Sequence, residues 1–226
     1  MKRNYIKVLS NQLTSQNKPI IFWDTCSLLD ILRLPYRRDR VCFLNNYIKI
    51  KEEIIANNII SVTSELVFLE YQDHFQEVYR ECENEIGKIK SKIDYYAKFL
   101  KEDYSNTDSA NTIPLNLQNI VDDIWNKTHV ILRENSFAKF AHIRTISKLP
   151  PAHKKGEYKD CYIWGTCLQL AKCISTHNIL FFSTNTTDYF LDDNMQSNSQ
   201  LKIDCNAHNN VKIKRNCGEI IGELNL

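Results

Sequence analysis

Short hydrophobic runs alternate with longer amphipathic segments along this chain. The runs at residues 20–23, 58–63, 178–183 and 211–215 have the length and apolar character of buried strands. Segments with a helical spacing of apolar residues separate these runs. Strands that alternate with helices form crossover connections, which produce a mostly parallel sheet with helices on both faces. The pattern therefore predicts an α/β protein of three layers, α/β/α, folded as one domain over residues 1–226.

A longer helical pattern follows the second predicted strand. Apolar and semi-apolar residues recur at spacings of four and three over residues 75–100, and a second such row covers residues 117–135. The polar stretch 104–114 between the two rows is typical of a loop. We therefore expect an inserted antiparallel helical hairpin at about residues 74–135, whose apolar rows serve packing. Unbroken, its first helix would span about 57 Å, so we expect either an interruption at Gly87 or a projecting hairpin.

The composition is that of a folded globular protein. Hydrophobic residues make up 43% of the chain, and 29 basic residues nearly cancel 27 acidic ones, so a basic surface requires local clustering. Residues 1–13 lack the apolar block of a signal peptide, and no stretch approaches the roughly 18 apolar residues of a membrane span. The eight cysteines include no Cys-x-x-Cys pair and are typical of reduced thiols. We expect a cytoplasmic protein with no membrane partner.

Several enzyme classes are excluded by what the sequence lacks. Its five glycines cannot supply a dinucleotide-binding fingerprint or the phosphate-binding loop of nucleotide triphosphatases. Cys26 occupies the position at which an aspartyl-phosphate hydrolase of the haloacid dehalogenase type carries its second aspartate. No cysteine is followed six residues later by the arginine of a thiol phosphatase loop. Phosphate chemistry in this chain would therefore need another kind of site.

Carboxylates follow the predicted strands or begin the helices after them. Asp24 comes directly after the first strand, Glu65 and Glu70 follow the second, Asp160 lies near a helix start, and Asp188 follows the third strand. The carboxyl ends of parallel strands meet at one edge of a sheet, so these acids can converge there. Converging carboxylates repel one another unless a cation lies among them, and Mg²⁺ and Mn²⁺ prefer oxygen ligands. A metal-dependent phosphodiesterase is favoured; for Asp24 and Asp160, a helix-capping role is the competing interpretation.

Four segments, in order, resemble the motifs of PIN domain nucleases. Residues 23–30 resemble the opening strand of that family, in which hydrophobic residues precede Asp-Thr-Asn-x-Leu. Residues 64–71 resemble its second motif, in which a Ser or Pro precedes a glutamate by six residues. Residues 160–164 are similar to the third motif, an aspartate that opens a helix, and residues 183–190 to the fourth. The stretch 149–157 further resembles a longer bacterial PIN-like subgroup.

The resemblance implies a sheet with a metal site at its carboxyl edge and cleavage of RNA that depends on Mg²⁺ or Mn²⁺. Its register selects Glu70 rather than Glu65. Two positions depart from the family pattern, namely Cys26 in place of the asparagine of the first motif and Asn185 where some members have an aspartate. The implied catalytic acids and metal ligands are Asp24, Glu70, Asp160 and Asp188, with Asn185 as an alternative or additional ligand at the fourth corner.

Two basic clusters flank the predicted ligands in sequence, one after the first motif and one before Asp160. Basic groups near an acidic site are needed to hold a polyanion, although a solvated face is the competing interpretation. Neighbouring tyrosines would supply stacking surfaces. The residues that we expect to contact substrate are Arg37, Arg38, Lys154, Lys155 and Lys159.

The leading hypothesis is therefore an endoribonuclease of the PIN type that cuts single-stranded RNA, as a toxin, an RNA-processing enzyme or a defence nuclease. A second hypothesis is a PIN-like scaffold that binds RNA or protein without catalysis, motivated by Asn185 and by the hairpin. A third is a structure-selective DNA nuclease whose hairpin holds DNA. An inhibitory or scaffolding protein partner and a homo-oligomer are compatible with each of them.

Overall fold

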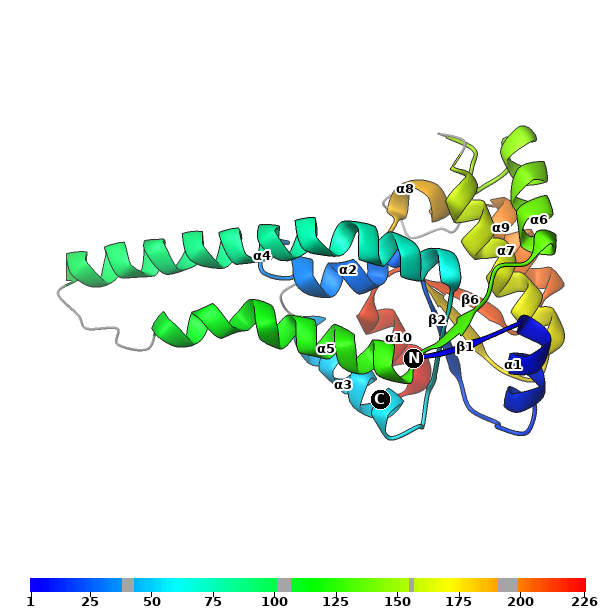
Figure 1. Cartoon of the computed structure of the whole chain (residues 1–226), viewed down its shortest axis with the longest axis horizontal. Coiled ribbons are helices and arrows are strands. Elements are labelled where there is room, and N and C mark those ends of the chain that lie inside the picture. The colour runs from blue at the N-terminus through cyan, green and yellow to red at the C-terminus, as the bar shows by residue number, and fades with distance from the viewer. Residues whose placement is uncertain (38–42, 101–106, 155–156, 191–198) are drawn as a thin grey trace.

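A computed structural model describes residues 1–37, 43–100, 107–154, 157–190 and 199–226 of the chain. Within these ranges, six strands form one parallel sheet in the order β1-β4-β3-β2-β5-β6 (Figure 1). The strands are β1 (Lys2–Asn4), β2 (Ile20–Trp23), β3 (Ile60–Ser64), β4 (His129–Ile131), β5 (Ile179–Phe182) and β6 (Val211–Lys214).

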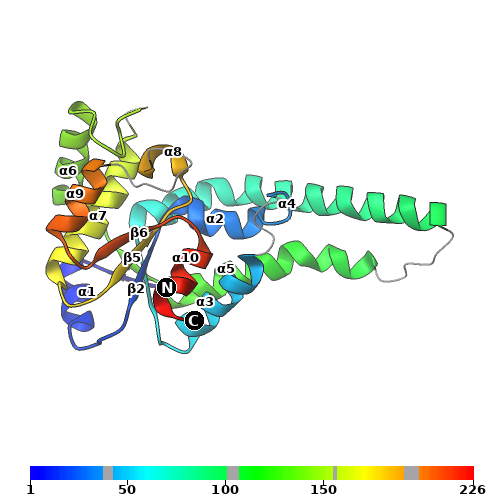
Figure 2. The ribbon, with the colours of Figure 1, turned by 180° about the vertical axis from the view of Figure 1, so that it is seen from behind.

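Helices cover both faces of this sheet, which confirms the predicted three-layer α/β/α fold (Figures 1 and 2). One layer contains α1 (Ile6–Leu13), α6 (Asn135–Ile146), α7 (Tyr158–Cys173) and α9 (Ser199–Ala207). The other contains α2 (Thr25–Arg33), α3 (Leu44–Ile55), α5 (Ile113–Lys127), α10 (Cys217–Leu224) and the first part of α4 (Glu65–Leu100). The short α8 (Thr186–Tyr189) follows β5, and a 3-10 helix (Thr107–Thr112) precedes α5.

The four predicted strands are confirmed, with bounds within two residues of the prediction. Two strands were missed, and the prediction that the second helical row continues to residue 135 is wrong. The helix α5 ends at Lys127, and Thr128 adopts an extended backbone that leads into β4. Val130 and Ile131 are fully buried there, because β4 pairs with β3 on one side and with β1 on the other. Ile124, Thr128 and Ile131 recur at the helical spacings of four and three, so pairing with the neighbouring strands outweighed the helical pattern here.

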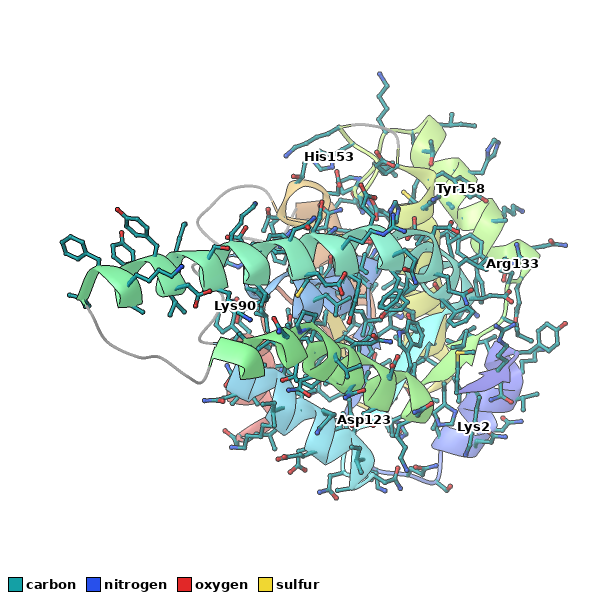
Figure 3. All side chains as sticks on the ribbon, turned by 60° about the vertical axis from the view of Figure 1, so that its left-hand side comes forward. Lys2, Lys90, Asp123, Arg133, His153 and Tyr158 are labelled. Atoms are coloured by element: carbon teal, nitrogen blue, oxygen red, sulfur yellow. The ribbon has the colours of Figure 1, made fainter. Side chains whose placement is uncertain are left out.

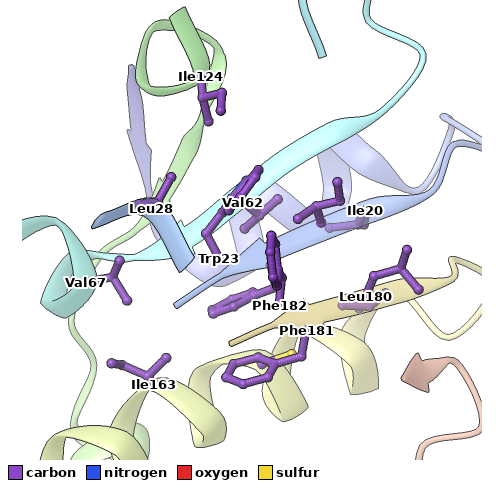
Figure 4. Close-up of a cluster of buried hydrophobic side chains, with 14 of the residues drawn as sticks. Ile20, Trp23, Leu28, Val62, Val67, Ile124, Ile163, Leu180, Phe181 and Phe182 are labelled. Atoms are coloured by element: carbon purple, nitrogen blue, oxygen red, sulfur yellow. The ribbon is translucent and has the colours of Figure 1, made fainter. Parts of the chain in front are cut away.

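Aromatic packing on both faces of the two central strands fixes the middle of the molecule (Figure 4). Trp23 ends β2 with its ring 5.3 Å from that of Phe182, which ends β5. On the other face, Phe181 contacts Trp164 of α7 edge-on, with 5.0 Å between ring centroids. The indole nitrogen of Trp23 donates a hydrogen bond of 2.9 Å to Ser61, so this buried polar group is satisfied. The buried ends of β2 and β5 therefore form a rigid support for the residues that directly follow these strands.

The two helices expected for the hairpin are α4 and α5, and α4 projects from the body (Figure 3). That they form an insertion at residues 74–135 stays a prediction. The helix α4 runs unbroken through Gly87 for 36 residues, or about 54 Å. Cys82 and Ile86 are buried in the inner half of its apolar row. The outer half of the same row is exposed and comprises Ile89, Ile93, Tyr96 and Leu100. No helix within the described ranges is long and apolar enough to cross a membrane.

Candidate active site

The four predicted acids lie on elements that begin at the carboxyl edge of the sheet. Asp24 directly follows β2 at the start of α2, and Glu70 lies in the second turn of α4, which follows β3. Asp160 lies in the first turn of α7, and Asp188 belongs to α8, which follows β5. All six described strands run in the same direction, so these elements open toward the same edge.

Asp24 is held by the strand ends rather than by the helix that it precedes. Its side chain is 2% exposed and makes no capping hydrogen bond to α2. Its Oδ2 accepts a hydrogen bond of 2.6 Å from Ser183 Oγ, and its backbone N–H donates to the carbonyl oxygen of Phe182. The pKa of Asp24 is raised to about 7, chiefly by burial; the hydrogen bond from Ser183 opposes this rise, and the charges of Glu70 and Asp188 add to it.

Asp160 is likewise a largely buried carboxyl group surrounded by other acidic groups. The pKa of its carboxyl group is raised to about 8, chiefly by burial and then by the charges of Asp24, Asp188 and Glu70, in that order. Its backbone carbonyl accepts a hydrogen bond of 3.2 Å from the hydroxyl group of Tyr189. The charges of Glu70 and Asp188 act on both Asp24 and Asp160, which requires these groups to be near one another. The structure thus places these four acids within electrostatic range of one another, and that they form a metal site stays a prediction.

Glu70 has partners that the other acids lack. Its Oε2 accepts a hydrogen bond of 2.7 Å from Thr25 Oγ1, and its Oε1 lies 3.1 Å from the ammonium group of Lys159. The hydrogen bond to Glu70 and its charge raise the pKa of Lys159. Glu70, the glutamate that the motif register selects, is also the one whose charge acts on Asp24 and Asp160. Glu65 instead contacts Arg133 and Arg3, which lie toward β4 and β1.

After β5, the side chain of Asn185 orients that of Asp188. The amide Nδ2 of Asn185 donates a hydrogen bond of 2.8 Å to Asp188 Oδ2, while its Oδ1 accepts from the backbone N–H of Asp188 at 3.4 Å. The side chain of Asn185 thus serves as the N-cap of α8. The other carboxylate oxygen of Asp188, Oδ1, is buried and makes no hydrogen bond with any described residue. A buried acceptor without a donor leaves a position for a cation.

The donor chemistry of this edge fits a hard divalent ion. The four acids offer oxygen ligands, their mutual repulsion is relieved by a positive charge, and one oxygen of Asp188 is without a donor in the described structure. Within the described ranges, no three side chains of His, Cys, Asp or Glu already form a group that could hold a metal ion. An ion would therefore have to draw these carboxylates together.

The predicted substrate-binding residues have different surroundings. The guanidinium group of Arg37 lies 2.7 Å from buried Asp30, and Lys159 is paired with Glu70. Lys154 is exposed on the segment that precedes α7. Arg38 and Lys155 lie outside the described residues.

The sequence interpretation did not identify the hydroxyl groups that hold the acids. Thr25 contacts Glu70, and Ser183 contacts Asp24. Thr25 lies two positions after the first predicted strand and Ser183 is the last residue of the third, where a small hydroxyl group can reach a neighbouring carboxylate. That position is the signal by which they could have been found.

A sequence model of the PIN domain matches residues 21–189, a range that contains all four acids. The chain belongs to the PIN domain family. PIN domains are generally nucleases, which supports a nuclease-type function for this chain. Neither the curated proteins nor the solved structures contain a match. Membership of the longer bacterial subgroup stays a prediction.

Proposed function

We propose that this PIN domain is a Mg²⁺- or Mn²⁺-dependent endoribonuclease that hydrolyses single-stranded RNA. The observation that carries the proposal is the crowding of carboxylates around buried Asp24 and largely buried Asp160 at the carboxyl edge, where the pKa of Asp24 is about 7 and that of Asp160 about 8. Perturbed carboxyl groups in one cluster are typical of a site that binds a cation or transfers a proton. All four acids lie within residues 21–189, the range that the PIN domain model matches.

The acids have separate roles in this proposal. Asp24, Asp160 and Asp188 supply the oxygen ligands, and Glu70 joins them once it leaves Lys159. Asp188 rather than Asn185 completes the set, because the amide group of Asn185 is already engaged by Asp188. When bound, the ion activates a water molecule and offsets the charge that develops on the phosphate. Ser183 and Asn185 keep two of the carboxylates in position during this step.

RNA contacts are proposed for the basic residues before α7 and after α2. Lys154 is exposed close in sequence to Tyr158, which is 40% exposed and offers a ring on which a base can stack. Arg38 and Lys155 are proposed contacts from sequence position. Arg37 would have to exchange its ion pair with Asp30 for a phosphate contact.

The experiment is cleavage of end-labelled single-stranded RNA by purified protein with Mn²⁺. We expect products with 5′-phosphate and 3′-hydroxyl ends, no activity in a chelator, and a loss of at least roughly 100-fold in Asp24→Asn and in Asp160→Asn. Single-stranded DNA and flap substrates are run in parallel and should be poorer substrates. Undiminished cleavage by both variants would overturn the assignment, and binding without turnover would favour a scaffold.

A further inference from the structure

Lys159 is a cation that the chain itself places against the acid cluster. Its ammonium group lies 3.1 Å from Glu70 Oε1, and it immediately precedes Asp160 in the first turn of α7. The side chain of Lys159 is 55% exposed, whereas that of Glu70 is 16% exposed. The contact is therefore made at the rim of the cluster, with the lysine on the solvent side.

This contact neutralises one acid and leaves the others unneutralised. Glu70 is engaged on both oxygens, by Lys159 and by Thr25. Asp188 Oδ1 has no hydrogen-bond partner among the described residues. A half-exposed ion pair is weak and exchanges readily, since solvent competes for both charges. Lys159 thus forms an ion pair with Glu70, a carboxylate that a divalent ion would also need as a ligand.

We propose that Lys159 competes with the divalent ion for Glu70, so that the ion pair is closed in the metal-free protein and opens when the ion binds. The inference rests on the proposed metal dependence. It adds the residue that tunes the affinity of the protein for the divalent ion. Lys159 is a positioning residue here, because it acts through Glu70. Once released, its ammonium group is at the rim where a phosphate arrives, so metal binding precedes RNA contact by this residue.

The test measures binding of Mn²⁺ to the purified full chain without RNA, by calorimetry or by the electron paramagnetic resonance of free Mn²⁺. In Lys159→Met, the ion gains Glu70 and loses a repelling charge, so the Kd should fall roughly threefold to tenfold. Lys159→Arg keeps a cation beside Glu70 and should bind Mn²⁺ as the unmodified protein does. Lys172→Met is the matched control, because Lys172 is an exposed lysine at the other end of α7.

An unchanged or raised Kd in Lys159→Met would overturn the competition. The same conclusion follows if this variant loses RNA affinity while its Kd for Mn²⁺ stays constant, since Lys159 would then contact phosphate alone. Because the readout contains no RNA, tighter Mn²⁺ binding without any RNA cleavage would support the competition and contradict the nuclease proposal. If neither protein binds Mn²⁺, both proposals fail. Circular dichroism confirms that each variant is folded.

Discussion

The hydroxyl group of Ser183 lies 2.6 Å from Oδ2 of Asp24, so a hydrogen bond joins the ends of β5 and β2 across 159 positions of sequence. This bond is the main stabilising contact of a buried carboxylate whose pKa is raised by burial and by its acidic neighbours. It also fixes which way the carboxylate of Asp24 faces. Positioning contacts of this kind are often as important to a metal site as the ligands.

Ser183→Ala should therefore weaken metal binding and cleavage by roughly 10- to 100-fold. Without the hydroxyl donor, the charged form of Asp24 loses stabilisation and its pKa rises, so the acid limb of the pH–rate profile should move to higher pH. Ser91→Ala is the control, because it removes a hydroxyl group on the exposed side of α4. A profile unchanged from that of the unmodified protein would contradict the role given to Ser183.

The metal-free protein should lose stability as pH rises from about 4 to about 8. Asp24 and Asp160 have folded-state pKa values of about 7 and about 8, above their ordinary value of 3.8. In that window the folded state holds protons that the unfolded chain has released, so stability falls with rising pH. Mg²⁺ or Mn²⁺ should restore the stability of the protein, most strongly near pH 8.

Thermal unfolding of Asp160→Asn isolates this effect from other titrating groups. The variant removes one of the repelling charges, so without metal at pH 8.5 its Tm should exceed that of the unmodified protein. The added stabilisation by metal should be smaller than in the unmodified protein. Asp123→Asn is the control: it removes a half-exposed carboxylate on α5 that lies 3.9 Å from Lys51, and it should show neither change. A lower Tm for Asp160→Asn than for the unmodified protein would contradict the prediction.

Asn185 should be required as an amide and not merely as a polar residue. In Asn185→Ala, Asp188 loses the donor at 2.8 Å, and metal affinity should fall by roughly 10-fold or more. Asn185→Asp should not rescue it, because a second carboxylate beside Asp188 adds repulsion and cannot donate. The measurement is the Mn²⁺ concentration that gives half-maximal cleavage. Full activity in Asn185→Asp would indicate that this position is itself a ligand.

Two glycines within helices should respond oppositely to alanine. A Cβ at Gly87 meets nothing within 4 Å, so Gly87→Ala should raise the free energy of unfolding by roughly 0.5–1 kcal/mol. A Cβ at Gly165 would lie 2.5 Å from Phe140 Cδ1, where α7 packs on α6, so Gly165→Ala should lower it by roughly 1–3 kcal/mol. Urea unfolding measures both, and equal effects would contradict the close helix contact.

Local pattern determined much of this protein. The central strands are short runs of apolar residues that are buried on both faces, so composition alone predicts them. The order of the motifs placed Asp24, Glu70 and Asp160 at the starts of helices, because a parallel sheet brings the carboxyl ends of its strands to one edge. The helical spacing of apolar residues also predicted the two long helices α4 and α5, which extend from the sheet.

Tertiary structure decided what local pattern leaves open. Val130 and Ile131 belong to a strand because β1 and β3 offer hydrogen bonds on both sides, which outweighs a helical spacing. Lys159 contacts Glu70 rather than solvent alone because the fold brings α4 and α7 together. Asn185 and Asp188 have distinct roles because one turn of helix aims the amide at the carboxylate. These outcomes depend on burial and on contacts between segments that are distant in sequence. A short stretch of sequence indicates only its local preference for helix or strand.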